Sequence, residues 1–565
     1  MRHATTTTDA APSAAPADHS SSRPPRAPKV LGADVELGNF ILGVEEPGGS
    51  GFAASRALLR EIPGASAGES ELPGSDPQNI GRRFLWTNGG CAYIDLDHLE
   101  LALPETRSAF DHVAYWRAMV SDARVALART NCRQPPGRRV QALANCSDGL
   151  DHSYGAHVNV CLTRAAWENI VRRKPHHLAS LAAFQVSSIV FTGQGKVGSE
   201  NGRPPVDFQI SQRADFVETL VGSQTTFNRP IVNSRDEPLC GGRSPSPATD
   251  AEPALARLHV IFFDSTLCDT ASLLRVGTLQ IVVAMLEAGR VDPGIALDDP
   301  LEALERWSHD PGLTATAATV CGDDVTAVDL QFRFLDAAKA FAAGGGCDGI
   351  VPRAAEILAL WEDTLLKLRA RDFAALSRRL DWVLKRHILE RVIARRTDLT
   401  WASPEIKHLD QLYASIDEAD GLFWACERTG LVDRLVSDDA VTIARGNPPE
   451  DTRAWTRAHL LRAAGAHRID SVDWDSVRLT VRVGRGWLEQ RTIRLPCPFG
   501  STRMQHAHLF DGDLTLEDIV DALEPKVIAS PGDRASVDAP ERRASLAAPP
   551  RSASLQAGNC GWTTH

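Results

Sequence analysis

Acidic residues two positions apart on strand-like segments are the first side chains here whose types and spacing could do chemistry. Asp34 and Glu36 lie in the alternating apolar and polar segment 30–43, and Asp95 lies in a second such segment, 84–96. Side chains two apart on a strand share a face, so Asp34 and Glu36 could together hold a hard cation such as Mg²⁺. Acidic residues on the solvated face of an edge strand give the same spacing. The pattern alone leaves both interpretations open.

Two segments in the middle of the chain combine arginines with apolar alternation. They are 208–216, which contains Arg213, and 229–238, which contains Arg235. Short charged clusters within such alternation predict strands that carry arginines toward an anionic ligand.

The elements that must position these residues follow from hydrophobic periodicity. We expect strands over 30–43, 84–96, 142–162, 258–263, 477–483 and 489–495, helices over 53–61, 106–128 and 269–287, and mainly helix over 327–426. Strands and helices do not alternate regularly, and polar residues at the start of 269–287 suit capping. The expected organisation is a disordered tail (1–29), a large catalytic domain (30–470), a small C-terminal domain (471–529) and a second disordered tail (530–565).

Composition narrows the function classes. The net charge of −11, from 61 basic and 72 acidic residues, argues against non-specific nucleic-acid binding. Eleven cysteines, an odd number without a C-x-x-C pair, are typical of reduced thiols and favour the cytoplasm. The longest apolar run, 273–286, is interrupted by Arg275 and Gln280 and is too short to cross a bilayer, so we expect no membrane span.

The amino-acid sequences of several segments are similar to those of one enzyme family. Segments 208–216 and 229–238 closely resemble the Pup ligase and Pup deamidase/depupylase family of carboxylate-amine ligase-like enzymes. The same likeness is found in 32–38, 87–100, 148–159, 257–261 and 447–454, and it extends from about residue 31 to 525. The resemblance implies an α+β, glutamine-synthetase-like fold, in which a curved antiparallel sheet is backed by helices and followed by a small C-terminal domain.

The resemblance also implies roles for individual residues, with ATP and Mg²⁺ as cofactors. Asp95 corresponds to the catalytic carboxylate of the family. The implied contacts to metal and nucleotide are Asp34, Glu36, Glu100, His157 and His259. The implied partners of phosphate, which arginine binds bidentately, are Arg213, Arg235 and Arg257.

The family acts on the C-terminal Glu or Gln of a small, disordered protein tag. The spacing of Asp95, His98 and Glu100, together with segment 208–215, favours a deamidase/depupylase that cleaves the C-terminal amide or isopeptide of a Pup-like tag. Segment 380–386 resembles the ligases of the family. The alternative function is therefore a ligase that joins the tag's Glu to a substrate lysine. The identity of the tag and its targets, and any link to a proteasome, stay open.

Three departures from the family pattern support another hypothesis, a catalytically weakened tag-binding protein. Asp34 stands where a Glu is expected, which shortens the reach of the carboxylate by one methylene. Val158 replaces the Glu expected after His157, and Leu239 replaces a His expected after Pro238.

Overall fold

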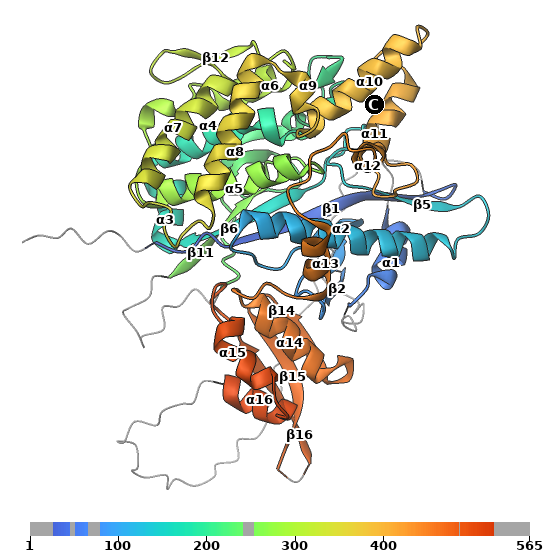
Figure 1. Cartoon of the computed structure of the whole chain (residues 1–565), viewed down its shortest axis with the longest axis vertical. Coiled ribbons are helices and arrows are strands. Elements are labelled where there is room, and N and C mark those ends of the chain that lie inside the picture. Colours follow the sequence, from blue (N-terminus) through green and yellow to red (C-terminus); the bar gives the residue numbers. More distant parts are fainter. Residues whose placement is uncertain (1–25, 46–50, 66–79, 241–253, 485, 525–565) are drawn as a thin grey trace, which may run out of the picture. The chain divides into compact units, whose positions relative to one another are not determined.

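An antiparallel sheet of seven strands lies at the centre of the computed structural model, which describes residues 26–45, 51–65, 80–240, 254–484 and 486–524. The strand order is β11-β6-β1-β4-β3-β2, and β5 pairs with the end of β1 (Figure 1). The strands are β1 (Leu31–Leu42), β2 (Ile80–Phe84), β3 (Cys91–Asp95), β4 (His98–Ala102), β5 (Arg139–Leu143), β6 (Ala156–Thr163) and β11 (Leu255–Val260).

Side-chain alternation gives this sheet two different faces. In β1, Ala33, Val35 and Leu37 belong to the apolar core, whereas Asp34 and Glu36 point to the opposite face. Three helices supply apolar side chains to the core: α1 (Phe52–Glu61), α2 (Ala109–Asn131) and α5 (Asp269–Glu287). The alternation expected over 30–43 is therefore the division between the core and the polar face.

Helix α5 is the most deeply buried element. Its length and composition would suffice to cross a membrane, but all 19 of its residues are buried inside the protein. The sequence predicted that polar side chains of the helix itself cap its start. This prediction is wrong, because no such side-chain hydrogen bond is present there among the described residues. Instead, Asp381 of α10 (Asp381–Arg395) accepts hydrogen bonds from the backbone N–H groups of Leu267 (3.1 Å) and Cys268 (3.2 Å). A distant carboxylate thus satisfies the donors that a buried helix start exposes.

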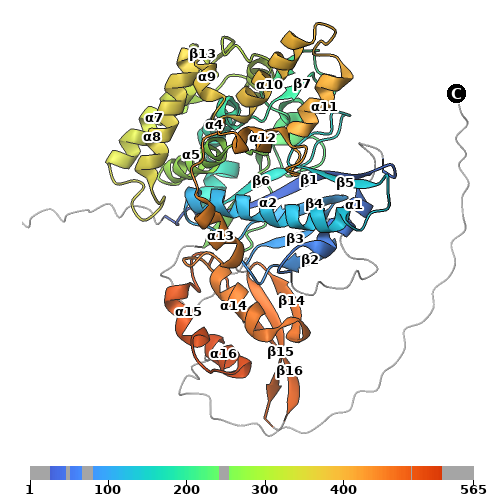
Figure 2. The same cartoon turned by 45° about the vertical axis from the view of Figure 1, so that its right-hand side comes forward.

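Further helices pack beyond α5, and Figure 2 shows them gathered on one side of the sheet. The helical composition expected over 327–426 is confirmed. The helices that pack beyond α5 are α4 (Pro175–Thr192), α6 (Pro300–Ser308), α7 (Ala327–Ala343), α8 (Ala354–Ala370), α10, α11 (Pro404–Tyr413) and α12 (Leu422–Arg428). Helix α13 (Asp438–Gly446) packs on α2.

The C-terminal part has a small sheet of its own, and its apolar residues pack with Phe84, Cys91, Tyr93 and Ala102 of the main sheet. The paired strands expected there are confirmed as β15 (Ser476–Val483) and β16 (Trp487–Arg494), joined by β14 (Ile469–Asp473). Thr515 and Asp518 exchange hydrogen bonds at the start of α16 (Leu516–Leu523) and so form a capping box. Helices α14 (Ala454–Ala464) and α15 (Arg503–Phe510) complete this part.

The ends of the chain differ in part from the expected tails. Residues 26–29 belong to the folded part, because Ala27 and Lys29 are buried and Lys29 Nζ lies 2.5 Å from Glu287 Oε2. The rest of the N-terminal tail and the whole tail proposed for 530–565 lie outside the described residues.

A buried carboxylate joins the main sheet to the C-terminal part. Glu105, just after β4, accepts hydrogen bonds from Arg453 Nε (2.7 Å) and Arg457 Nη2 (2.6 Å). Burial alone would raise the pKa of Glu105, but the two guanidinium groups outweigh it and hold the pKa at about 2. Arg453 also donates to the carbonyl oxygen of Leu239 (2.8 Å), so one cluster of charges ties together three distant segments.

We expect Glu105→Gln to destabilise the fold by about 3 kcal/mol, because it leaves two buried guanidinium groups without a counter-charge. Thermal unfolding followed by circular dichroism measures this loss. Glu450→Gln is the matched control, since Glu450 pairs with Arg503 at 2.6 Å on the exposed surface, where ion pairs contribute little. Equal melting temperatures for the two variants would contradict the role of Glu105.

Candidate functional site

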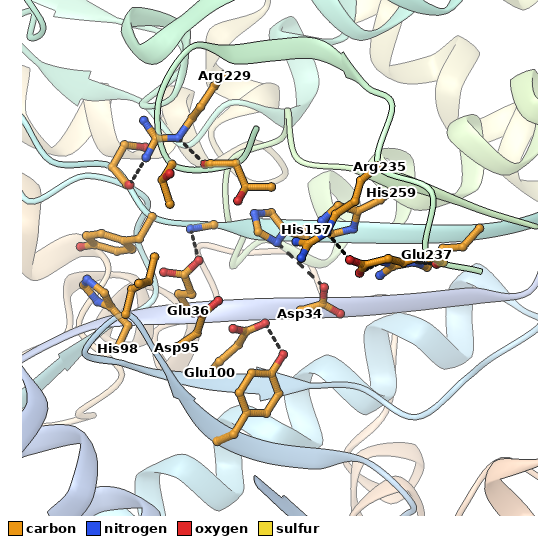
Figure 3. Close-up of a pocket in the computed structure, with 18 of the residues that line it drawn as sticks. Asp34, Glu36, Asp95, His98, Glu100, His157, Arg229, Arg235, Glu237 and His259 are labelled. Carbon is orange, nitrogen blue, oxygen red and sulfur yellow. Dashed lines mark hydrogen bonds and ion pairs between the residues drawn. The ribbon is translucent and has the colours of Figure 1, made fainter. Parts of the chain in front are cut away.

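All nine side chains singled out from the sequence line one pocket, of about 220 Å³, on the polar face of the sheet. Figure 3 shows Asp34, Glu36, Asp95 and Glu100 below His157, His259, Arg229 and Arg235. The nine are Asp34, Glu36, Asp95, Glu100, His157, Arg213, Arg235, Arg257 and His259.

Strand register explains this convergence. Asp34 on β1 lies directly opposite His157 on β6, and Glu36 lies opposite Glu100 on β4. On the outer side of β6, His259 of β11 lies opposite Asn159. Opposite residues of antiparallel strands project their side chains to the same face, about 5 Å apart. Residues more than 200 positions apart in the sequence therefore meet on one face of the sheet.

One corner of the pocket contains only carboxylates. Oxygen atoms of Glu36, Asp95 and Glu100 lie within 4.8 Å of one another. Tyr93 donates a hydrogen bond to Glu100 Oε1 (2.7 Å), but Asp95 Oδ1 and Glu100 Oε2 are buried and find no donor among the described residues. Burial raises the pKa of Glu36 to about 7, and burial with the neighbouring Glu36 charge raises that of Asp95 to about 7.

These features fit a bound divalent cation. Buried carboxylate oxygens without donors are the hard ligands that Mg²⁺ prefers. A nearby cation would also relieve the repulsion between the three negative charges.

The neighbouring corner contains nitrogen ligands. Ligand atoms of Asp34, His157 and His259 also lie within 4.8 Å of one another. Burial holds the pKa of both imidazoles well below the usual range, assisted by the charges of Arg213 near His157 and Arg257 near His259. The distance of 3.9 Å between His157 Nδ1 and Asp34 Oδ2 is thus a contact of a neutral ring rather than an ion pair. Neutral imidazole is the form that binds metal.

Arginines form the opposite wall. Arg257 and Arg235 both bind Glu237, with Arg257 Nε 2.7 Å from its carbonyl oxygen and Arg235 Nε 2.8 Å from Oε1. Arg229 donates to the carbonyl oxygen of Ser153 at 2.7 Å. A wall of guanidinium groups facing a carboxylate cluster is suited to an anion that brings its own cation, such as a metal-bound phosphate.

The strands predicted to carry the arginines are only partly present. Arg213 lies in a loop between the two-residue strand β8 (Phe208–Gln209) and a 3-10 turn, Ala214–Phe216. The loop is held by side chains: Asp264 accepts hydrogen bonds from the backbone N–H groups of Gln212 (2.8 Å) and Arg213 (3.1 Å). A buried carboxylate, not strand pairing, aims this arginine.

Several pocket residues were missed by the sequence reasoning. Tyr93 stands two positions before Asp95 on the same strand, so the strand period could have identified it. Trp474 enters the pocket from the turn between β14 and β15 and had no local signal. Arg82, Arg229 and Glu237 also line the pocket, as does His98, which was named from the sequence only for its spacing from Asp95 and Glu100.

The two unusual apolar residues occupy different places. Val158 is fully buried in the apolar core, on the face of β6 opposite to His157. Leu239 lines the pocket, is 37% exposed, and has a backbone φ of 49°. The departure at Val158 therefore removes no group from the pocket, while that at Leu239 does change its wall.

Comparison with known proteins agrees with this site. The family model described as "Pup-ligase protein" matches residues 51–478. The Pup deamidase/depupylase of Mycolicibacterium smegmatis is 34% identical over 422 residues, which cover 74% of this chain and 80% of that protein. The Pup–protein ligase of Acidimicrobium ferrooxidans is also 34% identical, over 419 residues, with 73% and 86% covered.

Solved structures show the same fold. The ligase PafA in its complex with the prokaryotic ubiquitin-like protein Pup superposes with a TM-score of 0.70 at 24% identity, covering 89% of this chain and 96% of that one. PafA in complex with ADP gives a TM-score of 0.62 at 25% identity, with 80% and 92% covered. The expected mixed α+β fold, an antiparallel sheet with helices, is confirmed. This chain belongs to the Pup ligase family of enzymes.

Proposed function

We propose that this protein is an ATP- and Mg²⁺-dependent deamidase/depupylase that acts on the C-terminal Gln or the isopeptide of a Pup-like tag. The observation that carries the proposal is a polar pocket in which neutral histidines and arginines meet carboxylates, two of which have an oxygen without a donor among the described residues. Solved relatives bound to ADP and to Pup support the choice of nucleotide and tag.

The pocket residues form two groups, one that would bind the metal and one that would bind phosphate. The five metal candidates, Asp34, Glu36, Glu100, His157 and His259, would hold Mg²⁺, and Arg213, Arg235 and Arg257 would hold phosphate, with Arg229 beside them. When bound, the magnesium nucleotide would supply positive charge and an anchored phosphate next to the scissile carbonyl. The protein's own contribution is to fix these groups on a rigid sheet before the tag arrives.

Asp95 is the candidate general base. It ends β3, is only partly buried, and precedes the turn residue Leu96, which is 44% exposed. Its Oδ1 atom finds no donor among the described residues, so it is the atom placed to accept a proton. In the deamidase/depupylase reaction that proton would come from the water that attacks the amide carbon.

The alternative function is ligation, in which Asp95 would accept the proton from a substrate lysine. Relatives of both kinds match this chain at the same 34% identity. The ligase-like segment 380–386 does not decide between them, because its charged residues serve the scaffold. Asp381 caps the start of α5, and Lys385 is buried 2.7 Å from Asp410.

A tag-binding protein without turnover is the third hypothesis. Val158 was one of its motives, but this side chain lies in the core and not in the pocket. Leu239 and Asp34, which both line the pocket, keep this hypothesis open.

Substitution of Asp95 tests the proposed chemistry. We expect Asp95→Asn to lower turnover by about 100-fold or more, because the amide cannot accept the proton. The assay is incubation with ATP, Mg²⁺ and a Pup-like tag ending in Gln or Glu, followed by ammonia release and by gel analysis of lysine conjugates.

The control for this experiment is Asp97→Asn, two positions further along the same turn. Asp97 has a φ of 73°, a conformation that Asn tolerates well, and it does not line the pocket. Ammonia release by the wild-type protein supports the deamidase, lysine conjugation supports the ligase, and tight tag binding without turnover supports the third hypothesis. Full activity in Asp95→Asn would reject its assigned role.

Binding of Mg²⁺ should depend on pH. The raised pKa values of Glu36 and Asp95, about 7 without a cation, mean that protons compete with the metal below neutral pH. Without metal, the stability contribution of these two carboxyl groups is present at acidic pH and is lost as the pH rises from their unfolded pKa near 4 through about 7.

We therefore expect Mg²⁺ to bind roughly tenfold or more weakly at pH 6 than at pH 8. Calorimetric titration gives the two affinities, and the rise in melting temperature on adding Mg²⁺ should likewise be larger at pH 8. Equal affinities at the two pH values would show that Glu36 does not bind the metal.

Restoring the family's Glu at position 158 should damage the protein. We expect Val158→Glu to lower the melting temperature and to bring no gain in turnover, because the new carboxyl group would enter the apolar core without a partner. Val158→Ala is the control for the loss of packing alone. Increased turnover in Val158→Glu would mean that this position faces the pocket.

A further inference from the structure

Asn159 of β6 lies at the junction of three pocket residues that come from the two neighbouring strands, β1 and β11. Its Nδ2 donates to Asp34 Oδ1 at 2.9 Å. Its Oδ1 lies 3.1 Å from Arg257 Nη1 and 2.8 Å from His259 Nδ1. The side-chain amide thus connects the carboxylate of β1 with an arginine and a histidine of β11.

Elementary hydrogen-bond chemistry fixes the orientation of this amide. A carboxylate only accepts hydrogen bonds, and a guanidinium group only donates them. The amide nitrogen must therefore face Asp34 and the amide oxygen must face Arg257. The reversed orientation would place the carboxylate against an oxygen and the guanidinium against an NH₂ group.

The same orientation selects the tautomer of His259. Because Asn159 Oδ1 can only accept, Nδ1 of His259 must carry the hydrogen in their 2.8 Å contact. Nε2 is then the ring nitrogen left to offer a lone pair. A ligand imidazole whose other nitrogen donates to a fixed oxygen is the usual arrangement around protein-bound metals.

His259 also lies beside the second histidine of the pocket. The rings of His157 and His259 are 5.0 Å apart in an edge-to-face arrangement, and both offer a ligand atom within 4.8 Å of Asp34 (Figure 3). Arg257, held by the same amide oxygen, lines the same pocket. One side chain therefore sets both a nitrogen ligand and a phosphate-binding arm.

We propose that Asn159 is a positioning residue that locks His259 as a nitrogen ligand for a divalent cation and orients Arg257 toward the phosphate beside it. The inference rests on the proposed nucleotide and metal binding. It adds that the Asn159 oxygen is the atom that leaves Nε2 of His259 available to the cation.

Two substitutions separate the functions of the amide. Asn159→Ala removes the acceptor for His259 and Arg257. Asn159→Asp keeps an acceptor for both but removes the donor to Asp34. The matched control is Asn131→Ala. The Asn131 amide likewise joins a donor and an acceptor, here the backbone nitrogen (2.8 Å) and oxygen (3.1 Å) of Val140, but it lies outside the pocket.

The measurement uses the full-length protein with Mn²⁺ and ADP as probes. Electron spin-echo envelope modulation detects ¹⁴N coupling from imidazole bound to Mn²⁺, and calorimetry gives the affinity. We expect the wild-type protein and Asn131→Ala to show this coupling. Asn159→Ala should lose the His259 coupling, so that its spectrum matches that of His259→Ala, and should bind Mn²⁺ about 10-fold more weakly.

Asn159→Asp should keep the His259 coupling, and it decides the question if Asn159→Ala does not fold. Unchanged coupling and affinity in Asn159→Ala, or lost coupling in Asn159→Asp, would overturn the inference. A wild-type protein that binds Mn²⁺ and ADP without nitrogen coupling overturns the inference alone. A wild-type protein that binds neither probe overturns the proposed function, and the inference with it.

Discussion

The alternation of side chains across one antiparallel sheet is the constraint on which the whole site depends. Each central strand sends apolar residues to the helices and charged residues to the pocket, so the two faces cannot change independently. A slip of one residue in β1 would bury Asp34 and Glu36 in the core and expose Ala33 and Val35. The core packing that stabilises the fold thereby also fixes the register of the site.

The pocket concentrates groups that repel each other, and the scaffold compensates for this. Three carboxylates crowd one corner, and several guanidinium groups crowd the other wall. Such an arrangement is unfavourable for the empty protein and favourable once oppositely charged partners enter. The charges are tolerated because the surrounding strands and loops are held elsewhere, for example by Asp264 beneath the Arg213 loop and by Asp381 at the start of α5.

The parts of the fold that were predictable from the sequence are those with a local period. The alternation in β1, the helix Asp269–Glu287 and the strand pair at the C-terminus were all visible, and the family resemblance supplied the residues that now line the pocket. Contacts between distant segments left no such trace. Neither the cap from Asp381 nor the entry of Trp474 into the pocket follows from neighbouring residues.

Orientation was the other limit of the sequence reasoning. The departure at Val158 looked like a missing site residue because a family pattern records which residue stands at a position, not which face of the strand it occupies.

The charge cluster around Glu105 has a consequence for the autonomy of the small C-terminal sheet. Through Arg453 the cluster reaches the carbonyl oxygen of Leu239 in the pocket wall, and through Trp474 the same part of the chain supplies a pocket side chain. Residues 453–524 are consequently not a separate unit that could be exchanged between family members. Grafting them from a relative would require transferring the wall segment that contains Leu239 as well, since the hydrogen bond from Arg453 to Leu239 connects the two.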